Sequence, residues 1–280
     1  MYNKRSAYIG VAILLILLTV VIAGCTSSSP SASPTPVATA PVQQTTLTVF
    51  AAASLSDAFN ETAAAYEAQH PGVKIVYNFA GTQALVSQVE LGASADVFAS
   101  ASPKYMTQLS GEGYINNSTI VNFTNNSLAI IVPVSNPANI TTVNDLAKPG
   151  VKIDVGAATV PCGSYTLQLL NKSANVTGYG ATFANGVRAN IVSNETDVNS
   201  IVSKVALGEV DAGFVYVSDV PATMKDKVKV ITIPAEINVI AVYPIGVISQ
   251  SKDQADAESF IQFVTSSAGK TILDNHGFKA

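Results

Sequence analysis

Short β-rich runs alternate with segments of helical periodicity from residue 47 to the C-terminus. The runs 47–51, 73–79 and 96–100 are rich in β-branched and aromatic residues, which predicts strands. Apolar residues recur at helical spacing over 55–66 and 85–89, which predicts helices between these strands. A strand–helix–strand–helix–strand order is typical of a parallel sheet with helices on both faces. The sequence therefore predicts an α/β fold.

A second series of the same kind follows a strand predicted over 128–133. No linker-like stretch separates the two series, so we expect two lobes that pack across a cleft. Ligands of open α/β sheets bind at the carboxyl ends of the strands, and clefts between domains are common ligand sites. The second series comprises predicted strands at 153–156, 188–192, 213–217 and 228–233, helices at 164–170 and 198–205, a β-rich run at 237–249, and helical patterns around 260–264 and 271–273.

Composition excludes several classes of protein. The 280 residues carry 15 lysines and arginines, a formal net charge of −4 and no basic stripe, which excludes a typical nucleic-acid binder. Two cysteines and two histidines leave too few ligands for a four-cysteine zinc site or a histidine cage. No pair of carboxylates is placed as a general acid and base. We therefore expect no free metal cation, no cofactor and no enzymatic activity.

Residues 1–24 are predicted to be a signal peptide. Lys4 and Arg5 precede an uncharged apolar run over 7–23, and small residues then lead to Cys25. This ending resembles a lipobox, so Cys25 is the expected lipidation site. The alternative is an uncleaved membrane anchor, because the run is just long enough to span a bilayer. Both interpretations place the chain on the outer face of the cytoplasmic membrane.

Residues 25–46 are predicted to be a tether. The segment is rich in serine, threonine and proline and carries no charge, so it cannot bury enough apolar surface to fold. Cleavage before Cys25 would remove Lys4 and Arg5, and the formal net charge would change from −4 to −6.

Small or hydroxyl-bearing residues recur where a predicted strand passes into a predicted helix. Helix N-termini present unpaired N–H groups and the positive end of the helix dipole, and they therefore bind anions. At a single turn, an ordinary N-cap is the simpler interpretation. The repetition of such turns in one two-lobed chain favours capture of an anion. The turns contain Ser54, Gly81 with Thr82, Cys162 with Gly163, and Asp197 with Val198.

Cys162 supports an alternative hypothesis. It is the one thiol left once Cys25 is lipidated, and a cysteine at a helix N-terminus can be a nucleophile. No motif pairs it with a base. A surface hydrolase that uses Cys162 is thus the alternative from a different class of function.

Several segments together resemble the extracytoplasmic molybdate-binding proteins that feed ABC importers. The likeness extends from residue 47 to the C-terminus, and it lies in the order and spacing of the segments rather than in one motif. The segments are Val-Phe-Ala-Ala-Ala-Ser-Leu at 49–55, Phe-Ala-Gly-Thr at 79–82, Val-Pro-Cys-Gly at 160–163, Gly-Phe-Val-Tyr-Val-Ser-Asp at 213–219 and Gly-Phe at 277–278.

This resemblance implies a two-lobed fold of the type II periplasmic-binding-protein kind, with the ligand between the lobes. Residues 47–130 and 238–280 would form lobe 1, and 131–237 would form lobe 2. The protein would be a monomer that binds molybdate or tungstate and delivers it to an ABC permease and its ATPase. It would be held at the membrane through lipidated Cys25 or the uncleaved leader.

The resemblance also implies a site made of neutral donors. Ser54 and Thr82 would donate from lobe 1 through O–H and N–H groups. Cys162 and Val198 would donate backbone N–H groups from lobe 2, and Tyr216 would donate its phenol O–H. Two positions depart from the family, which usually has serine in place of Thr82 and alanine in place of Cys162.

Other ligands and roles stay open at this stage. The same scaffold could bind another oxyanion such as sulfate, and a carboxylate could complete the coordination of the metal. The chain could also be the binding module of a sensor or an adhesin. The preference between molybdate and tungstate is not fixed by the sequence.

Overall fold

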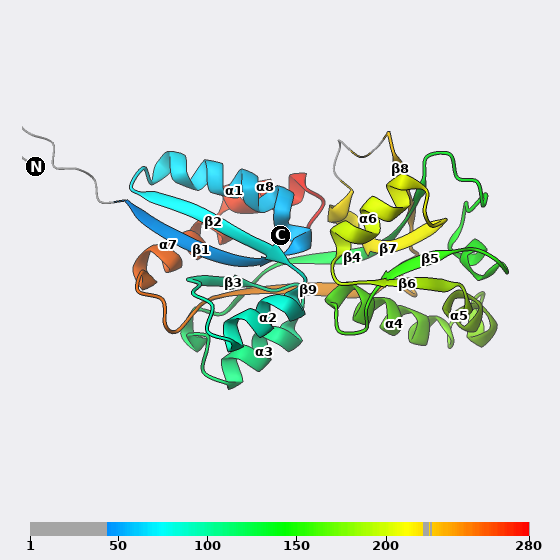
Figure 1. The fold of residues 1–280 in the computed structure, drawn as a ribbon, viewed down its shortest axis with the longest axis horizontal. Helices are drawn as coiled ribbons and strands as arrows, with labels where there is room; N and C mark the ends of the chain where they lie inside the picture. Colours follow the sequence, from blue (N-terminus) through cyan, green and yellow to red (C-terminus); the bar gives the residue numbers. More distant parts are fainter. Residues whose placement is uncertain (1–43, 221–223, 225, 280) are drawn as a thin grey trace, which may run out of the picture. The chain divides into compact units, whose positions relative to one another are not determined.

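The structure is a computed structural model that describes residues 44–220, 224 and 226–279. The helices and strands form a mixed α/β fold of two lobes (Figure 1). The leader predicted at 1–24, and the predicted tether up to residue 43, lie outside the described residues. The first strand, β1 (Thr45–Ala52), includes the last two positions of the predicted tether, because Thr45 and Thr46 already pair with β2.

In the first lobe, β1 lies between β2 and β3 and is parallel to both, as the sequence predicts. Val49 packs with α1 in the main core, whereas Phe50 packs with α2 and α3 in a second core cluster. Helices therefore cover both faces of this sheet. The sequence analysis did not predict α3. The elements are β2 (Val73–Ala80), β3 (Val97–Ala99), α1 (Ser56–Gln69), α2 (Thr82–Glu90) and α3 (Pro103–Gly111).

The second lobe repeats this arrangement. Strand β5 lies between β6 and β7 and is parallel to both. The fully buried Ile201 and Val205 of α6 pack in one cluster with the fully buried Val215 of β7. The elements are β5 (Ile153–Gly156), β6 (Ile191–Glu195), β7 (Ala212–Tyr216), β8 (Val228–Thr232), α4 (Pro161–Ser173), α5 (Gly180–Ala189) and α6 (Val198–Leu207).

Two long strands, β4 (Val121–Pro133) and β9 (Ile240–Val247), connect the lobes. Residues 121–127 of β4 pair antiparallel with β9, whereas residues 128–133 pair with β7 and β8. The sheet order is β2-β1-β3-β9-β4-β7-β5-β6, so parallel groups are joined by antiparallel strands. Helices α7 (Gln254–Thr265) and α8 (Ser267–Asn275) return to the first lobe and contact α1. The lobe limits given above stay predictions.

The structure corrects two sequence predictions. The strand predicted at 188–192 is wrong, because Arg188 and Ala189 end α5, whose buried residues Phe183 and Val187 follow helical spacing. Strand β6 begins only at Ile191. The strand predicted at 128–133 begins earlier, at Val121, and includes the asparagine-rich segment that precedes residue 128.

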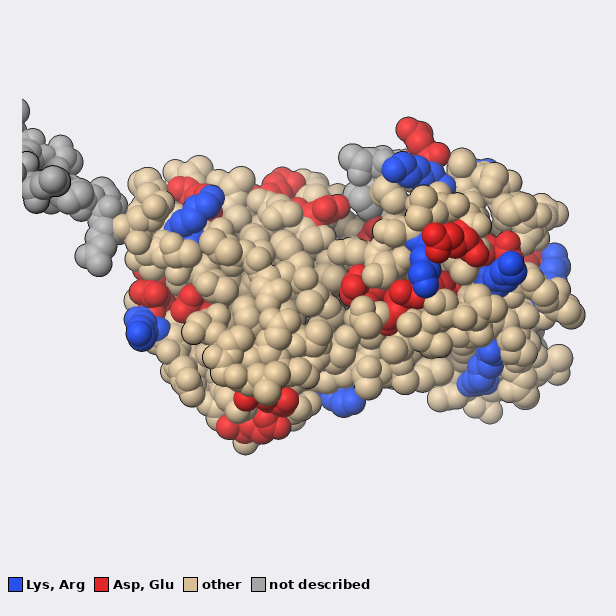
Figure 2. Space-filling model, viewed as in Figure 1, with Lys and Arg blue, Asp and Glu red and all other residues tan. Residues whose placement is uncertain are grey.

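Charged residues are unevenly spread on the face drawn in Figure 2. Basic side chains lie singly, whereas acidic side chains gather beside the junction of the lobes (Figure 2). This face therefore presents negative charge beside the junction of the lobes.

Candidate functional site

A small cavity lies where helices of both lobes begin. Its volume is about 20 Å³, which is the space that about one water molecule needs. All of the residues predicted to bind the ligand line it together: Ser54, Thr82, Cys162, Val198 and Tyr216. Among the described residues that line the cavity, none is a lysine or an arginine.

On the side of the first lobe, α2 begins directly after β2. Its N-cap residue, Gly81, has no side chain, so it cannot satisfy the N–H groups of the first turn. The Oγ1 atom of Thr82 accepts a hydrogen bond of 3.2 Å from the N–H of Ala101. Because this bond occupies an acceptor position, the hydroxyl proton of Thr82 remains free for donation to a ligand.

On the side of the second lobe, α4 begins directly after β5. Its N-cap residue is Val160, whose side chain cannot accept a hydrogen bond, and its first residue is Pro161, which has no N–H. The N–H of Cys162 is thus the first donor of this helix. At Gly163, a Cβ atom would lie 2.1 Å from the carbonyl oxygen of Gly156, so only glycine lets α4 start this close to β5.

The thiol of Cys162 bonds within the protein. Its Sγ atom donates to the carbonyl oxygen of Phe214 at 3.4 Å, and the residue is fully buried. Burial, followed by the charge of Asp219, raises the pKa of the thiol well above its ordinary value. The two histidines contact Tyr66 and Glu61 instead. A neutral thiol that has no base as a partner among the described residues gives no support to the hydrolase hypothesis.

The turn that contains Asp197 and Val198 differs from the other turns because a side chain caps the helix that follows it. The carboxylate of Asp197 accepts a hydrogen bond of 3.0 Å from the N–H of Ser200 at the start of α6. Its charge is thereby held against the first turn of the helix. Val198, the first residue of α6, is buried and lines the cavity.

Tyr216 ends β7 and is 1% exposed. Its phenol oxygen is buried and has no hydrogen-bond partner among the described residues. Burial raises the pKa of this phenol well above its ordinary value, so the hydroxyl is neutral and keeps its proton. A buried hydroxyl without a partner costs about 1–3 kcal/mol. A ligand in the cavity that accepts this proton would remove the cost.

Hydrogen bonds between the lobes lie close to the cavity in the chain, next to residues that line it. Gln83 donates from Nε2 to the carbonyl oxygen of Thr196 at 2.8 Å, and Tyr105 donates to the carbonyl oxygen of Thr159. A Cβ atom at Gly81 would lie 2.2 Å from the same Thr196 oxygen. Glycine at this position therefore lets the rims of the lobes meet.

The sequence model of the bacterial extracellular solute-binding proteins matches residues 47–279. The chain belongs to this family. A molybdate-binding protein ModA of Mycobacterium tuberculosis is 36% identical over 255 residues, which are 91% of this chain and 91% of that protein. A molybdate-binding protein ModA of Haemophilus influenzae is 32% identical over 243 residues, which are 84% of this chain and 90% of that protein.

Solved structures share the fold of this solute-binding protein. The periplasmic molybdate-binding protein of Azotobacter vinelandii superposes with a TM-score of 0.72 at 20% identity, over 84% of this chain and 99% of that chain. At this identity the likeness concerns the fold, which is the two-lobed type II fold. Within the described part of the chain, no helix is long and apolar enough to cross a membrane.

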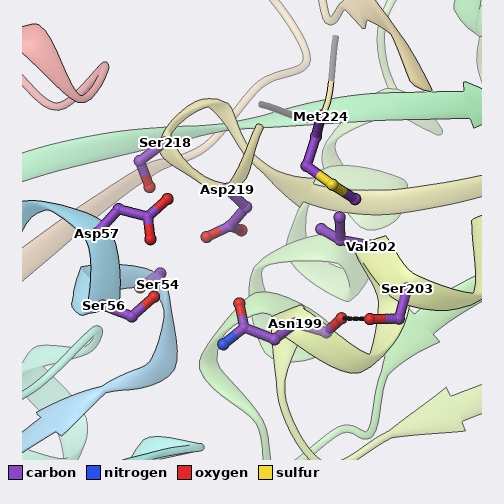
Figure 3. A pocket seen from close by; sticks show the side chains of 9 residues that line it. All are labelled: Ser54, Ser56, Asp57, Asn199, Val202, Ser203, Ser218, Asp219 and Met224. Carbon is purple, nitrogen blue, oxygen red and sulfur yellow. Dashed lines mark hydrogen bonds between the residues drawn. The ribbon is translucent and has the colours of Figure 1, made fainter. Parts of the chain in front are cut away.

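A second pocket of this solute-binding protein adjoins the cavity and shares Ser54 with it (Figure 3). Its volume is about 240 Å³, and the carboxyl groups of Asp57 and Asp219 face each other across it (Figure 3). One oxygen of Asp219 accepts from the N–H of Tyr216 at 2.7 Å, and the other has no partner among the described residues. Burial, and then the charges of Asp57 and Asp197, raise the pKa of Asp219 to about 8. Asp219 is therefore mostly neutral at neutral pH, which limits the negative charge beside the cavity.

Sequence reasoning missed two buried residues behind Ser54. The hydroxyl of Tyr243 lies 2.9 Å from Ser54 Oγ, and Asn126 bonds to Ser218. Tyr243 lies in the β-rich run at 237–249, where nothing in the local pattern marks it. Only the pairing of β9 with β4 brings it to the site.

Proposed function

We propose that this solute-binding protein captures molybdate or tungstate outside the cytoplasmic membrane and delivers it to an ABC importer. The observation that carries the proposal is the buried Tyr216 hydroxyl, which lines the cavity and has no partner among the described residues. Helix N-termini of both lobes surround it. The relatives named as molybdate-binding proteins support the same ligand class.

Neutral donors alone suffice for such a ligand. A hydrogen bond to an ion contributes about 1.5–3 kcal/mol when the donor is fixed and dry. We assign O–H donation to Ser54, Thr82 and Tyr216, and backbone N–H donation to Cys162 and Val198. A fully deprotonated oxyanion can accept from all of these groups. The O–H of a protonated phosphate would lack an acceptor, at a cost of about 1–3 kcal/mol.

The remaining assignments concern the protein's place in the cell. We propose that Cys25 is lipidated after cleavage of residues 1–24, and that the residues between Cys25 and β1 tether a monomer to the membrane. The permease would then recognise the closed pair of lobes. We propose binding and delivery only, with no catalytic step and no cofactor.

Calorimetry tests the ligand. Residues 42–280 form one compact unit, so a fragment that begins at residue 42 can be titrated with molybdate, tungstate, sulfate and phosphate. We expect tight one-to-one binding of molybdate and tungstate and weak responses to the other two. Tight binding of sulfate alone would show that the site binds a smaller oxyanion instead of molybdate or tungstate. A folded fragment that binds none of them would contradict the proposal.

Mass spectrometry of membrane fractions tests the anchor. We expect a diacylglyceryl mass on the peptide that begins at Cys25, and Cys25→Ala should abolish it. If every copy of the protein keeps residues 1–24, the anchor is the uncleaved leader and not a lipid on Cys25.

A further inference from the structure

We propose that the pocket between Asp57 and Asp219 is a binding site for a hydrated divalent cation of the Mg²⁺ type, which bridges the two lobes beside the oxyanion. This pocket shares Ser54 with the oxyanion cavity. The cation site is inferred from the pocket alone, whereas its effect on the oxyanion rests on the proposed function. The expectation of no free metal cation rested on counts of cysteine and histidine, and it did not weigh carboxylates that folding brings together.

Asp219 supplies the buried half of the site. It ends the short 3-10 helix η4 (Val217–Asp219) and is 8% exposed. Its Oδ2 atom accepts from the N–H of Tyr216, whereas its Oδ1 atom is buried and has no hydrogen-bond partner among the described residues. A negative charge on Oδ1 therefore lacks a donor, and a proton on Oδ1 would lack an acceptor. A cation bound at Oδ1 would satisfy the group.

Asp57 supplies the exposed half of the site. It lies in the first turn of α1 in the first lobe, and its carboxyl group faces that of Asp219 across the pocket (Figure 3). Neither carboxyl group forms an ion pair with a lysine, arginine or histidine of the described residues. Two carboxylates that face each other repel, and a cation between them converts this repulsion into attraction.

The rest of the pocket is rich in oxygen. None of the described residues that line it is a lysine, arginine, histidine or cysteine, which excludes a typical zinc site. Mg²⁺ prefers oxygen ligands, keeps several waters and is usually held by one or two carboxylates. The volume of about 240 Å³ has room for such a hydrated ion. The other oxygen-bearing side chains of the lining belong to Ser54, Ser56, Asn199, Ser203 and Ser218.

The affinity of this site for the cation should be weak. Among the described residues, no group of three or more acidic, histidine or cysteine side chains is placed to hold a metal ion. Two carboxylates and water leave most of the hydration shell in place, and we expect a Kd of about 1 mM. Such an affinity suits a protein outside the cytoplasmic membrane, where the cation is a constituent of the medium.

The cation and the oxyanion should bind cooperatively. They carry opposite charges in adjoining pockets, and each would favour the closed arrangement of the lobes that the other needs. Linkage requires that each ligand raise the affinity of the other by the same factor. We expect a factor of about ten, which is an ordinary coupling between two sites.

Manganese tests the position of the ion, because Mn²⁺ accepts oxygen ligands and gives an anomalous signal in diffraction. Crystals of the fragment that begins at residue 42 should be prepared with MnCl₂ well above the expected Kd, with and without molybdate. We expect an anomalous peak between Asp57 and Asp219 that excess MgCl₂ removes. No peak at this position in either crystal would overturn the cation site, whatever the protein does with oxyanions.

Calorimetric titration with molybdate over a series of MgCl₂ concentrations tests the coupling. At constant ionic strength, we expect the molybdate Kd of the wild type to fall about tenfold, with half of the effect at about 1 mM Mg²⁺. A molybdate Kd that does not respond to Mg²⁺ would overturn the coupling.

Asp57→Asn separates the bound cation from a structural role of the carboxyl group. Without Mg²⁺, we expect the variant to bind molybdate at least as tightly as the wild type, because a negative charge is lost, and Mg²⁺ should then have no effect. The control is Asp256→Asn, which removes a first-turn carboxylate from α7 and should keep the tenfold response. A response that survives in Asp57→Asn would overturn the proposal. The proposed function fails by a different result, which is a wild-type titration in which no oxyanion binds with or without Mg²⁺.

Discussion

Replacing Tyr216 with phenylalanine should change affinity and stability in opposite directions. The phenol oxygen is buried and unpartnered among the described residues, so the protein without ligand gains nothing from it. With an oxyanion present, the same O–H would make a charge-assisted hydrogen bond. The variant therefore separates a ligand-binding hydroxyl from a structural one.

The magnitudes follow from the environment of the group. Loss of one charge-assisted bond of about 1.5–3 kcal/mol should raise the Kd by roughly ten- to a hundredfold. Removal of an unsatisfied buried hydroxyl should raise the free energy of unfolding of the ligand-free protein by about 1 kcal/mol. For a chain of this size that corresponds to a Tm higher by roughly 2–4 °C.

The assay pairs calorimetric titration with thermal unfolding, each with and without molybdate. Tyr77→Phe serves as the matched control, because its hydroxyl donates to the carbonyl oxygen of Phe59 at 2.7 Å. That variant should lose stability and keep its affinity. If Tyr216→Phe binds molybdate as tightly as the wild type, or if its ligand-free Tm falls like that of the control, the assignment of Tyr216 to the site is refuted.

Three further changes probe other parts of the site. In the folded protein, Cys162 should resist thiol alkylation, because burial raises the pKa of its thiol. Cys162→Ser should change the oxyanion Kd by less than about threefold. Rapid alkylation that abolishes oxyanion binding would contradict both expectations. Asp219 should contribute to the free energy of unfolding in full below about pH 4, and this contribution should be lost as the pH rises through its native pKa of about 8. Oxyanion affinity should fall over the upper part of that range, and Asp219→Asn should flatten both profiles in calorimetry and thermal unfolding. Gly81→Ala should weaken oxyanion binding at least about tenfold, because the alanine Cβ would lie 2.2 Å from the Thr196 oxygen and hold the lobes apart. Solution scattering should detect the more open form of the variant. Unchanged oxyanion binding would exclude closure of the lobes at this contact.

Local patterns were sufficient for much of the fold. Runs of β-branched and aromatic residues predicted β1 and β2, and apolar residues at helical spacing predicted the helices that follow these strands. The wrong strand prediction at 188–192 also arose from a local pattern. Helix α5 has only a short apolar face around Phe183 and Val187, and the β-branched Ile191 and Val192 that follow drew the predicted strand too far towards the N-terminus.

The polar segment of β4 could not be predicted in this way. Asn126 is a poor strand former, yet it is buried in β4 because its amide accepts from the N–H of Ser127 and donates to Ser218 Oγ. The bond to Ser218 joins residues that are 92 positions apart in the chain, and no local window of sequence contains it.

Long-range contacts also attach the candidate site to the strands that connect the lobes. Asn126 lies on β4 just before that strand changes partners, and Tyr243 lies on β9, the other strand that connects the lobes. Ser218 follows β7 in the second lobe, and Ser54 follows β1 in the first. The bond between Ser54 and Tyr243 and the bond between Asn126 and Ser218 therefore join the site to the connecting strands, away from the rims where Gln83 meets Thr196. Opening the rims would break the contact between Gln83 and Thr196 but would not require the bond between Ser54 and Tyr243 to break. Closure of the rims would then bring the helix N-termini of the second lobe to a first-lobe site that is already held in place.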